Sequence, residues 1–300
     1  MNHLQLTRLL IRASNRLPYF IALDAALILG RLGYWIYRSE RKQALKNIRA
    51  CYPEEPHSTH RGIAMRAFQH MTVTAMELFR FSGNRSYADQ VITVRNLHHV
   101  TEALDGERGV LLVSAHYGNL HLLPFAFEGI CREPAYIMRR PTRKLGQIVA
   151  QFRAYRDAYL KPLSSFRSLD SSIGGAVSAG HLLKRGNAVI VVADLTWGSG
   201  AVPVTFLGVP HYMSRAPASL SLLTGASLLP AIISRNADGS YEVVVEPPIE
   251  RPAGTSKRDA ERAMMESFAK VLERRVRACP EQWFWMHRPV PLAAPHSYRA

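Results

Sequence analysis

One short apolar run, which ends abruptly at a histidine, constrains the fold of this chain more than any other part of its sequence. The run from Gly109 to Ala115 is short for a helix and apolar almost throughout, which is typical of a strand buried on both faces of a sheet. His116 follows it directly, residues 117–119 carry turn chemistry, and an apolar stretch of helical length resumes at Leu120. His116 is therefore expected at a strand-to-helix corner.

A histidine at such a corner is a candidate for chemistry. In open α/β sheets, ligands bind in the crevice beyond the carboxyl ends of the strands, and the following helix directs its N–H groups into that crevice. The small residues Ser114 and Ala115 before His116 leave room for a substrate beside the imidazole. The alternative is a structural histidine that is merely hydrogen-bonded.

The rest of the chain predicts an α/β fold, with a mixed, mostly parallel central sheet flanked by helices. Helical stretches separate most of the strand-like runs, which is the alternation typical of such sheets. Those runs are Val91–Arg95, Gly109–Ala115, Ala135–Met138, Ala188–Ala193, Leu228–Ser234 and Tyr241–Val245. Between Val202 and Pro230 we expect an irregular loop and then a helix from about Arg215 to Thr224. A capping-box-like pattern starts another helix near Ser256.

Charge predicts an anionic partner. The 300 residues include 38 Lys and Arg against 23 Asp and Glu, a net charge of +15, and 47% of them are hydrophobic. This composition excludes a disordered chain and a protein with many membrane spans. Anionic membrane, nucleic acid or an acidic carrier protein would each suit the charge, although no nucleic-acid-binding motif accompanies it. We therefore predict no nucleic-acid partner.

The first part of the chain predicts a membrane-associating segment. The apolar run from Leu17 to Ile36 is long enough to cross a bilayer, but Asp24 and Arg31 interrupt it, each costing roughly 2.5–3.5 kcal/mol at the bilayer centre. We favour an interfacial or partly immersed helix, followed by basic residues that suit anionic lipid. An ordinary packed helix is the alternative. Residues 1–52 would form this segment and residues 53–300 the α/β domain.

Two further features lie beside predicted strand ends. Asp194 closes the apolar run that starts at Ala188, where a lone acid is a stronger site candidate than one on a helix surface. A basic stretch follows the run that ends at Met138, and it suits recognition of phosphate or of an acidic protein, or else forms a solvated helix face. Its members are Arg139, Arg140, Arg143, Lys144, Arg153, Arg156 and Lys161.

No metal or cofactor is predicted. The three cysteines, Cys51, Cys131 and Cys279, are far apart and odd in number, which fits neither a disulfide framework nor a cysteine zinc site. His116 and His121 are five residues apart across a turn, unlike the i, i+4 helical pair of zinc proteases.

Several motifs in order resemble the lipid A biosynthesis acyltransferase family, which includes lauroyl and myristoyl transferases and is related to the phosphatidylinositol mannoside acyltransferases. They are Ala44–Arg49 before Tyr52-Pro53, Ser114–Asn119, the strand end at Asp194, Phe206–Gly208 with Thr224–Ala226, and Pro280–Arg288. The resemblance implies a glycerolipid acyltransferase-like fold and an enzyme on the cytoplasmic face of the bacterial inner membrane. Such an enzyme moves a fatty acyl chain from an acyl carrier protein or coenzyme A thioester to a lipid or glycolipid acceptor, without a cofactor.

The resemblance also implies roles for site residues. The family pattern has Asp or Glu five positions after the catalytic histidine, but this chain has His121 there. We therefore expect His116 to be the general base, Asp194 to be its orienting acid and His121 to lie behind them. A catalytically degenerate lipid-binding protein on the same scaffold is the alternative.

Two further sets of residues are expected to contact the substrates. Tyr117, Gly118 and Asn119, with the adjoining helix N-terminus, are the expected donors to the thioester oxyanion. Arg139 and the two later arginines, Arg153 and Arg156, are expected to bind the acidic donor protein.

Overall fold

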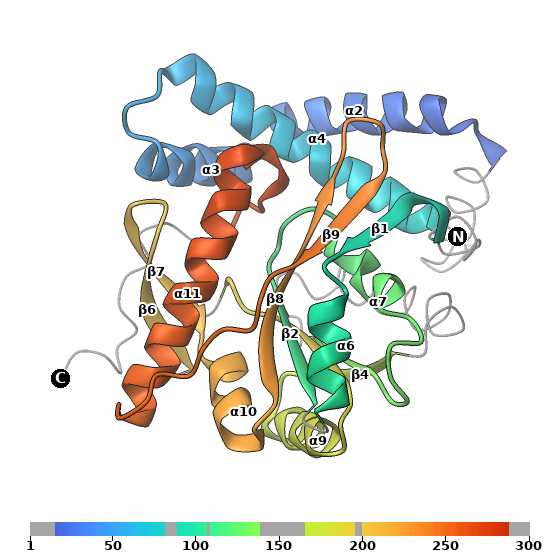
Figure 1. Ribbon diagram of the computed structural model, residues 1–300. Coiled ribbons are helices and arrows are strands. Elements are labelled where there is room, and N and C mark those ends of the chain that lie inside the picture. The colour runs from blue at the N-terminus through green and yellow to red at the C-terminus, as the bar shows by residue number, and fades with distance from the viewer. Residues whose placement is uncertain (1–15, 82–88, 107–108, 139–165, 196–199, 288–300) are drawn as a thin grey trace.

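The computed structural model describes residues 16–81, 89–106, 109–138, 166–195 and 200–287. Its centre is a seven-stranded sheet, and Figure 1 shows how the helices lie around it. The strand order is β1-β9-β8-β2-β5-β3-β4, and every pairing is parallel except β8 with β9. The strands are β1 (Ile92–Arg95), β2 (Val110–Ser114), β3 (Ala135–Met138), β4 (Arg167–Asp170), β5 (Ala188–Val192), β8 (Ser227–Arg235) and β9 (Tyr241–Val245). The predicted mixed, mostly parallel sheet is confirmed.

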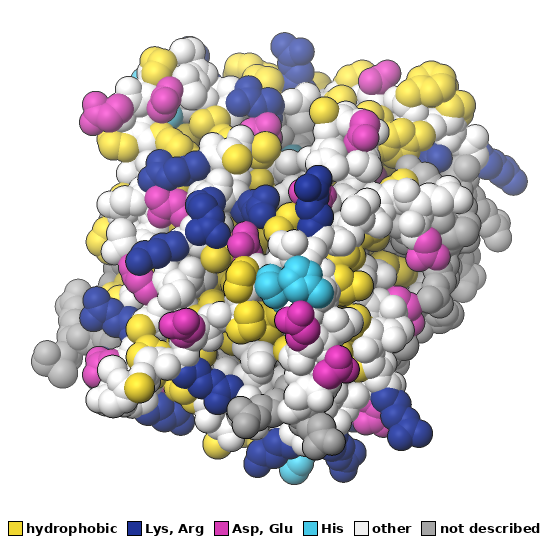
Figure 2. Space-filling view, in the orientation of Figure 1, with side chains coloured by type: hydrophobic (Ala, Val, Ile, Leu, Met, Phe, Trp, Pro, Cys, Tyr) yellow, Lys and Arg dark blue, Asp and Glu magenta, His cyan; other side chains and the backbone are white. Residues whose placement is uncertain are grey.

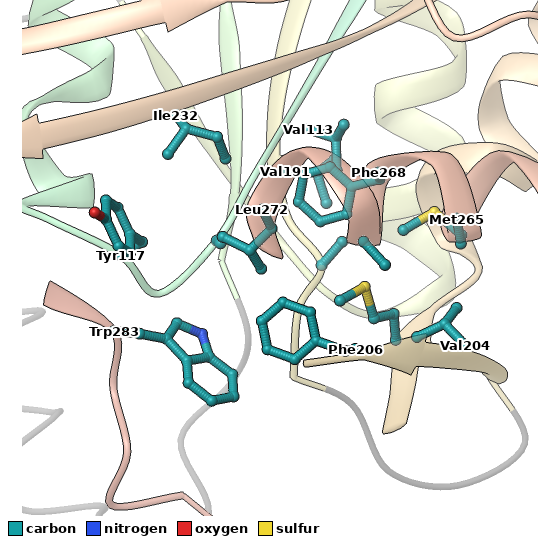
Figure 3. Packing of buried hydrophobic residues seen from close by; sticks show 14 of the residues in the cluster. Val113, Tyr117, Val191, Val204, Phe206, Ile232, Met265, Phe268, Leu272 and Trp283 are labelled. Carbon is teal, nitrogen blue, oxygen red and sulfur yellow. The ribbon is translucent and has the colours of Figure 1, made fainter. Parts of the chain in front are cut away.

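Helices cover both faces of the sheet, because its central strands carry apolar side chains on both sides. Along β2, Leu111 and Val113 join the core cluster that includes α9 (Ile173–Lys184), α10 (Ala216–Thr224) and α11 (Lys257–Ala278). Val110 and Leu112 join a second cluster with α6 (His98–Asp105) and α7 (Leu123–Ala126) on the opposite face. Figure 3 shows α11 packed on the first face, with Phe268 and Leu272 close to Val113 and Ile232.

Three segments differ from the sequence prediction. Residues 201–214, expected to be an irregular loop, form an antiparallel hairpin of β6 (Ala201–Phe206) and β7 (Val209–Ser214). Leu207 and Gly208 both have positive φ in its two-residue turn, a conformation that a leucine rarely adopts, and prolines in both strands weaken the strand signal. Strand β4 was also missed, because it is short and carries polar residues at the sheet edge.

The third difference lies just beyond His116. The stretch from Leu120 forms only a short 3-10 turn, η1 (Leu120–Leu122), and the four-residue α7, rather than a helix of ordinary length. Its apolar residues are buried instead in the cluster under the sheet. The expected helix of ordinary length is therefore wrong, and such a short element has little dipole. Donation by its N–H groups to the thioester oxyanion stays a prediction.

The N-terminal helices form a layer across one end of the sheet (Figure 1). They are α2 (Tyr19–Ile36), α3 (Arg38–Cys51) and α4 (His57–Phe81). Helix α2 packs its small residues Ala22, Ala26 and Gly30 on α4 so closely that a Cβ at Gly30 would lie 2.4 Å from the Cα of Gln69. Among the described helices, α2 alone is long and apolar enough to cross a membrane.

The outer face of α2 is apolar and exposed. Figure 2 shows hydrophobic side chains along the upper edge of the molecule, where Figure 1 places α2 and α4. Large side chains on this face are 42–69% exposed, namely Phe20, Ile21, Ile28, Leu29, Leu32, Trp35 and Ile36. Asp24 and Arg31 are also exposed, so neither charge is buried by the packing on α4.

Candidate active site

His116 lies at the carboxyl end of β2, in the loop that the sequence predicts. Its backbone is held by the C-terminal segment, since the Phe284 N–H donates to the His116 carbonyl at 3.0 Å and the Gly118 N–H donates to the Gln282 carbonyl at 3.0 Å. The imidazole is 40% exposed, and a base must remain accessible in this way to meet a substrate.

Strand register brings Asp194 to His116. Ser114 at the end of β2 pairs with Val192 at the end of the parallel strand β5, and each site residue comes two positions later. His116 Nδ1 and Asp194 Oδ1 are 2.8 Å apart. The side chain of Asp194 is fully buried, so this contact is shielded from water.

The contact decides which nitrogen of His116 faces outward. An ionised carboxylate can only accept hydrogen bonds, so Nδ1 carries the proton that it donates to Asp194. The other nitrogen, Nε2, is then an unprotonated acceptor in the neutral ring. This arrangement is able to accept a proton from a substrate group and to stabilise the resulting imidazolium through Asp194.

Asp194 is ionised despite its burial. Burial by itself raises the pKa of this carboxyl, but the charge of His116 and the hydrogen bonds from His116 and Trp283 outweigh it, and the pKa is lowered. Its backbone is fixed as well, because His211 Nε2 donates to the Asp194 carbonyl at 2.8 Å. Burial lowers the pKa of His211, which favours a neutral ring whose proton is on Nε2, the nitrogen that makes this contact.

The three residues after His116 are held by protein groups. Tyr117 is buried and its hydroxyl donates to the Arg275 carbonyl at 3.0 Å, while Asn119 is buried with its amide 3.5 Å from the hydroxyl of Tyr241. The Gly118 N–H is engaged by Gln282. Their expected contacts with substrate stay a prediction, and the Gly118 N–H would first have to leave Gln282.

Of the remaining predicted site residues, the structure describes His121 but not the three arginines. His121 is half-buried in η1, while Nδ1 of His116 donates its hydrogen bond to Asp194. Arg139, Arg153 and Arg156 lie outside the described residues, so their expected role in binding the donor stays a prediction. Within the described ranges, no group of three His, Cys, Asp or Glu is arranged to hold a metal ion.

Sequence reasoning missed two residues that hold Asp194, namely Trp283 and His211. Trp283 Nε1 lies 2.9 Å from Asp194 Oδ2, across 89 positions of sequence. The available signal was the motif Pro280–Arg288, which carries part of the family resemblance but indicates no contact with Asp194 by itself. His211 had no signal, because it belongs to the hairpin that was expected to be a loop.

A cavity of about 610 Å³ lies at the carboxyl end of β5, and neither His116 nor Asp194 is among its described lining residues. Val192 and Leu195, which flank Asp194 in sequence, line it together with apolar residues of α10, including Leu220 and Leu223. Arg215 and Lys257 are the cationic residues in its wall. A largely apolar pocket with a few polar groups is the usual form of a site for a small or extended organic ligand.

The α/β fold, with a polar pair at the carboxyl ends of two neighbouring parallel strands, defines the class of the protein as an α/β enzyme. A sequence profile of the bacterial lipid A biosynthesis acyltransferases matches residues 6–289, so the chain belongs to that family and is an acyltransferase. The resemblance noted from the motifs is confirmed.

Individual relatives agree with this assignment. The chain is 25% identical over 283 residues to the lipid A biosynthesis lauroyltransferase of Escherichia coli K12, and 24% identical over 282 residues to the palmitoleoyltransferase of the same organism. A lipid A biosynthesis acyltransferase of Shigella flexneri is also 24% identical. Each alignment covers 91% of this chain and 86% of the relative.

Proposed function

We propose that this acyltransferase moves a fatty acyl chain from a thioester donor to a hydroxyl or amine of a lipid A-type glycolipid, with His116 as the general base. The single observation that supports this role is the 2.8 Å contact between His116 Nδ1 and the buried Asp194 carboxylate. Family membership supports the acceptor class, since the relatives named above are lipid A biosynthesis enzymes.

The chemistry follows from this pair. Nε2 of His116 takes the proton of the acceptor hydroxyl as its oxygen attacks the thioester carbonyl. The tetrahedral oxyanion then collapses to an ester, the carbon–sulfur bond breaks, and the imidazolium returns the proton to the departing thiolate. Asp194 stabilises the imidazolium between these two steps and holds the ring in the tautomer that starts the cycle.

The cavity at the carboxyl end of β5 is the proposed place for the acyl chain. Its apolar wall, which includes Val191, Leu195 and Leu220, suits a hydrocarbon. Arg215 and Lys257 in the same wall suit the more polar part of a donor.

Residues 1–52 are the proposed membrane-associating segment, with residues 53–300 as the acyltransferase domain. Helix α3, which follows α2 directly, carries basic residues that include Arg38, Lys42 and Lys46, and the guanidinium of Arg41 lies 5.3 Å from the ring centroid of Trp35 on α2. Apolar side chains with adjacent cations suit insertion beside anionic headgroups, as at the cytoplasmic leaflet of the bacterial inner membrane. Since α2 lies along α4, we propose that it rests in the plane of the interface.

The proposed donor is an acyl carrier protein rather than free coenzyme A. The basic stretch that contains Arg153 and Arg156 would dock an acidic carrier. Changing both arginines to Glu should therefore weaken use of the carrier-bound donor more than use of the coenzyme A thioester. Equal losses with both donors would contradict this docking.

The function is tested by incubating the purified full chain with bacterial membranes and an acyl carrier protein that carries a radiolabelled fatty acyl chain. The lipids are then extracted and analysed for label. Wild type should transfer label to a lipid A-type product, while His116→Ala and Asp194→Asn should lose activity by about 10³-fold or more. His98→Ala, on the exposed surface of α6, is the control and should behave as wild type. Transfer that is insensitive to both site variants would refute the mechanism, and a lipid-binding protein without activity would show no labelled product at all.

A further inference from the structure

Both oxygens of the Asp194 carboxylate have a defined partner. Oδ1 lies 2.8 Å from His116 Nδ1, and Oδ2 accepts a hydrogen bond of 2.9 Å from the indole N–H of Trp283. Trp283 is 1% exposed and Asp194 is 0% exposed. Water therefore cannot replace either contact without a change in the packing.

The indole ring is itself held firmly. Figure 3 shows Trp283 beside Phe206 at the edge of the core, and their ring centroids are 5.0 Å apart in an edge-to-face arrangement. The ring of Trp285 also packs edge-to-face on the Trp283 ring, with the two centroids 4.7 Å apart. The backbone of Trp283 also forms a bridge with Tyr117, the residue after the proposed base.

We propose that Trp283 is a positioning residue of the acyl-transfer site, which orients the Asp194 carboxylate so that its other oxygen meets His116. A carboxylate rotates readily about its Cβ–Cγ bond, and the hydrogen bond at Oδ2 selects one rotation. The backbone N–H of His116 also donates to this carboxylate, but without the indole N–H the buried carboxylate loses its Trp283 donor and would turn to share the contacts that remain. This inference rests on the proposed function of His116 and Asp194.

The backbone contacts of the same segment point in the same direction. Phe284, the next residue, donates its N–H to the His116 carbonyl, and Gln282, the preceding one, accepts from the Gly118 N–H. Three consecutive residues near the C-terminus thus hold the base, its loop and its acid. A variant that loses only the indole N–H loses the contact with Asp194 but keeps the backbone contacts with His116 and Gly118.

The chain supplies a matched control in Trp285. Its indole N–H also makes a hydrogen bond, to the Pro280 carbonyl at 2.6 Å, and its side chain is also buried in the core. Trp285→Phe therefore removes one indole N–H from the same aromatic cluster without touching Asp194. Any loss common to Trp283→Phe and Trp285→Phe reports packing rather than orientation of the carboxylate.

The experiment measures kcat and KM for acyl transfer by wild type, Trp283→Phe, Trp285→Phe, Asp194→Asn and the double variant Trp283→Phe/Asp194→Asn. We expect Trp283→Phe to lower kcat by about 10-fold to 100-fold with KM nearly unchanged, the scale on which hydrogen bonds that orient a functional group act. Trp285→Phe should stay within about threefold of wild type. The double variant should be no worse than Asp194→Asn, because the two residues act through one contact.

A tryptophan analogue covers the case in which Trp283→Phe fails to fold. Benzothienylalanine at position 283 keeps the fused ring and replaces only the N–H by sulfur, and it should give the same fall in kcat. Equal losses in Trp283→Phe and Trp285→Phe, fully additive losses in the double variant, or full activity with the analogue would overturn the inference. Full activity of Asp194→Asn would instead refute the proposed function itself.

Discussion

The guanidinium of Arg235, at the end of β8, lies 3.1 Å from the buried carboxylate of Glu77 on α4. Tyr19 of α2 donates its hydroxyl to the same carboxylate at 2.7 Å, and the hydroxyl of Tyr241 also donates to it. Gln282 forms two hydrogen bonds of 2.8 Å with the backbone of Arg235. One buried ion pair therefore joins the N-terminal helices, the sheet and the segment that holds the site loop.

Loss of this pair should destabilise the whole protein. Glu77→Gln leaves the Arg235 guanidinium without its charged partner in a largely buried place, where such a loss costs about 3–5 kcal/mol of unfolding free energy. Glu281→Gln is the control, because its contact with Arg66 is 3.8 Å long and half exposed and should contribute less than about 1 kcal/mol. Urea denaturation followed by circular dichroism measures both. If both variants lowered the unfolding free energy by a similarly small amount, the ion pair of Glu77 and Arg235 would not be important for stability.

Gly118 is expected to tolerate no side chain. Its φ is +57°, and a Cβ there would lie 2.1 Å from the carbonyl oxygen of Ile233, a backbone atom of β8 that cannot move aside. Gly118→Ala should therefore be more destabilising than Gly208→Ala, whose φ is +78° but which has no atom within 4 Å. The left-handed conformation costs about 1–2 kcal/mol in both variants, so the difference in unfolding free energy between them reports the clash. Similar values would contradict it.

His121 occupies the position at which the family pattern has an acid. We expect His121→Ala to lower turnover by about 10-fold, the effect of losing a positioning contact. The loss should be no larger because Asp194 already orients His116. His121→Glu should remain active and should restore part of the activity lost in Asp194→Asn, because a carboxylate in η1 could stabilise the imidazolium. Steady-state acyl transfer by these three single variants and by the double variant His121→Glu/Asp194→Asn tests this. A silent Asp194→Asn with an inactive His121→Ala would make His121 itself the catalytic group.

Acid should destabilise the protein through His70. Burial lowers the pKa of this α4 histidine from 6.5 to about 4, a shift that the backbone of Gly118 partly offsets. Between those pH values the unfolded chain binds a proton that the folded protein does not, so unfolding free energy falls as pH falls from 6.5 towards 4, by up to about 3 kcal/mol. His70→Gln should flatten this part of the stability curve, while His57→Gln, at an exposed position, should not. An unchanged slope in His70→Gln would place the acid sensitivity elsewhere.

The sequence alone determined the elements whose residues carry a local pattern. Apolar runs predicted six of the strands, and the helix expected from about Arg215 to Thr224 is α10. Ser256 predicted the start of α11, where its hydroxyl accepts from the Asp259 N–H. His116 and Asp194 were recognised because each follows such a run. These signals work because periodicity and capping depend on residues only a few positions apart.

Only the tertiary structure decided how those pieces meet. The pairing of β2 with β5 in the register of Ser114 with Val192 brings His116 and Asp194 together, and no pattern within either strand specifies that neighbour. Burial of Trp283 and Trp285 in the core places the Trp283 indole on the second carboxylate oxygen, and packing under the sheet leaves only one helical turn after η1. Such contacts join residues 78 and 89 positions apart, and they depend on which apolar surfaces pack together across the domain rather than on local periodicity.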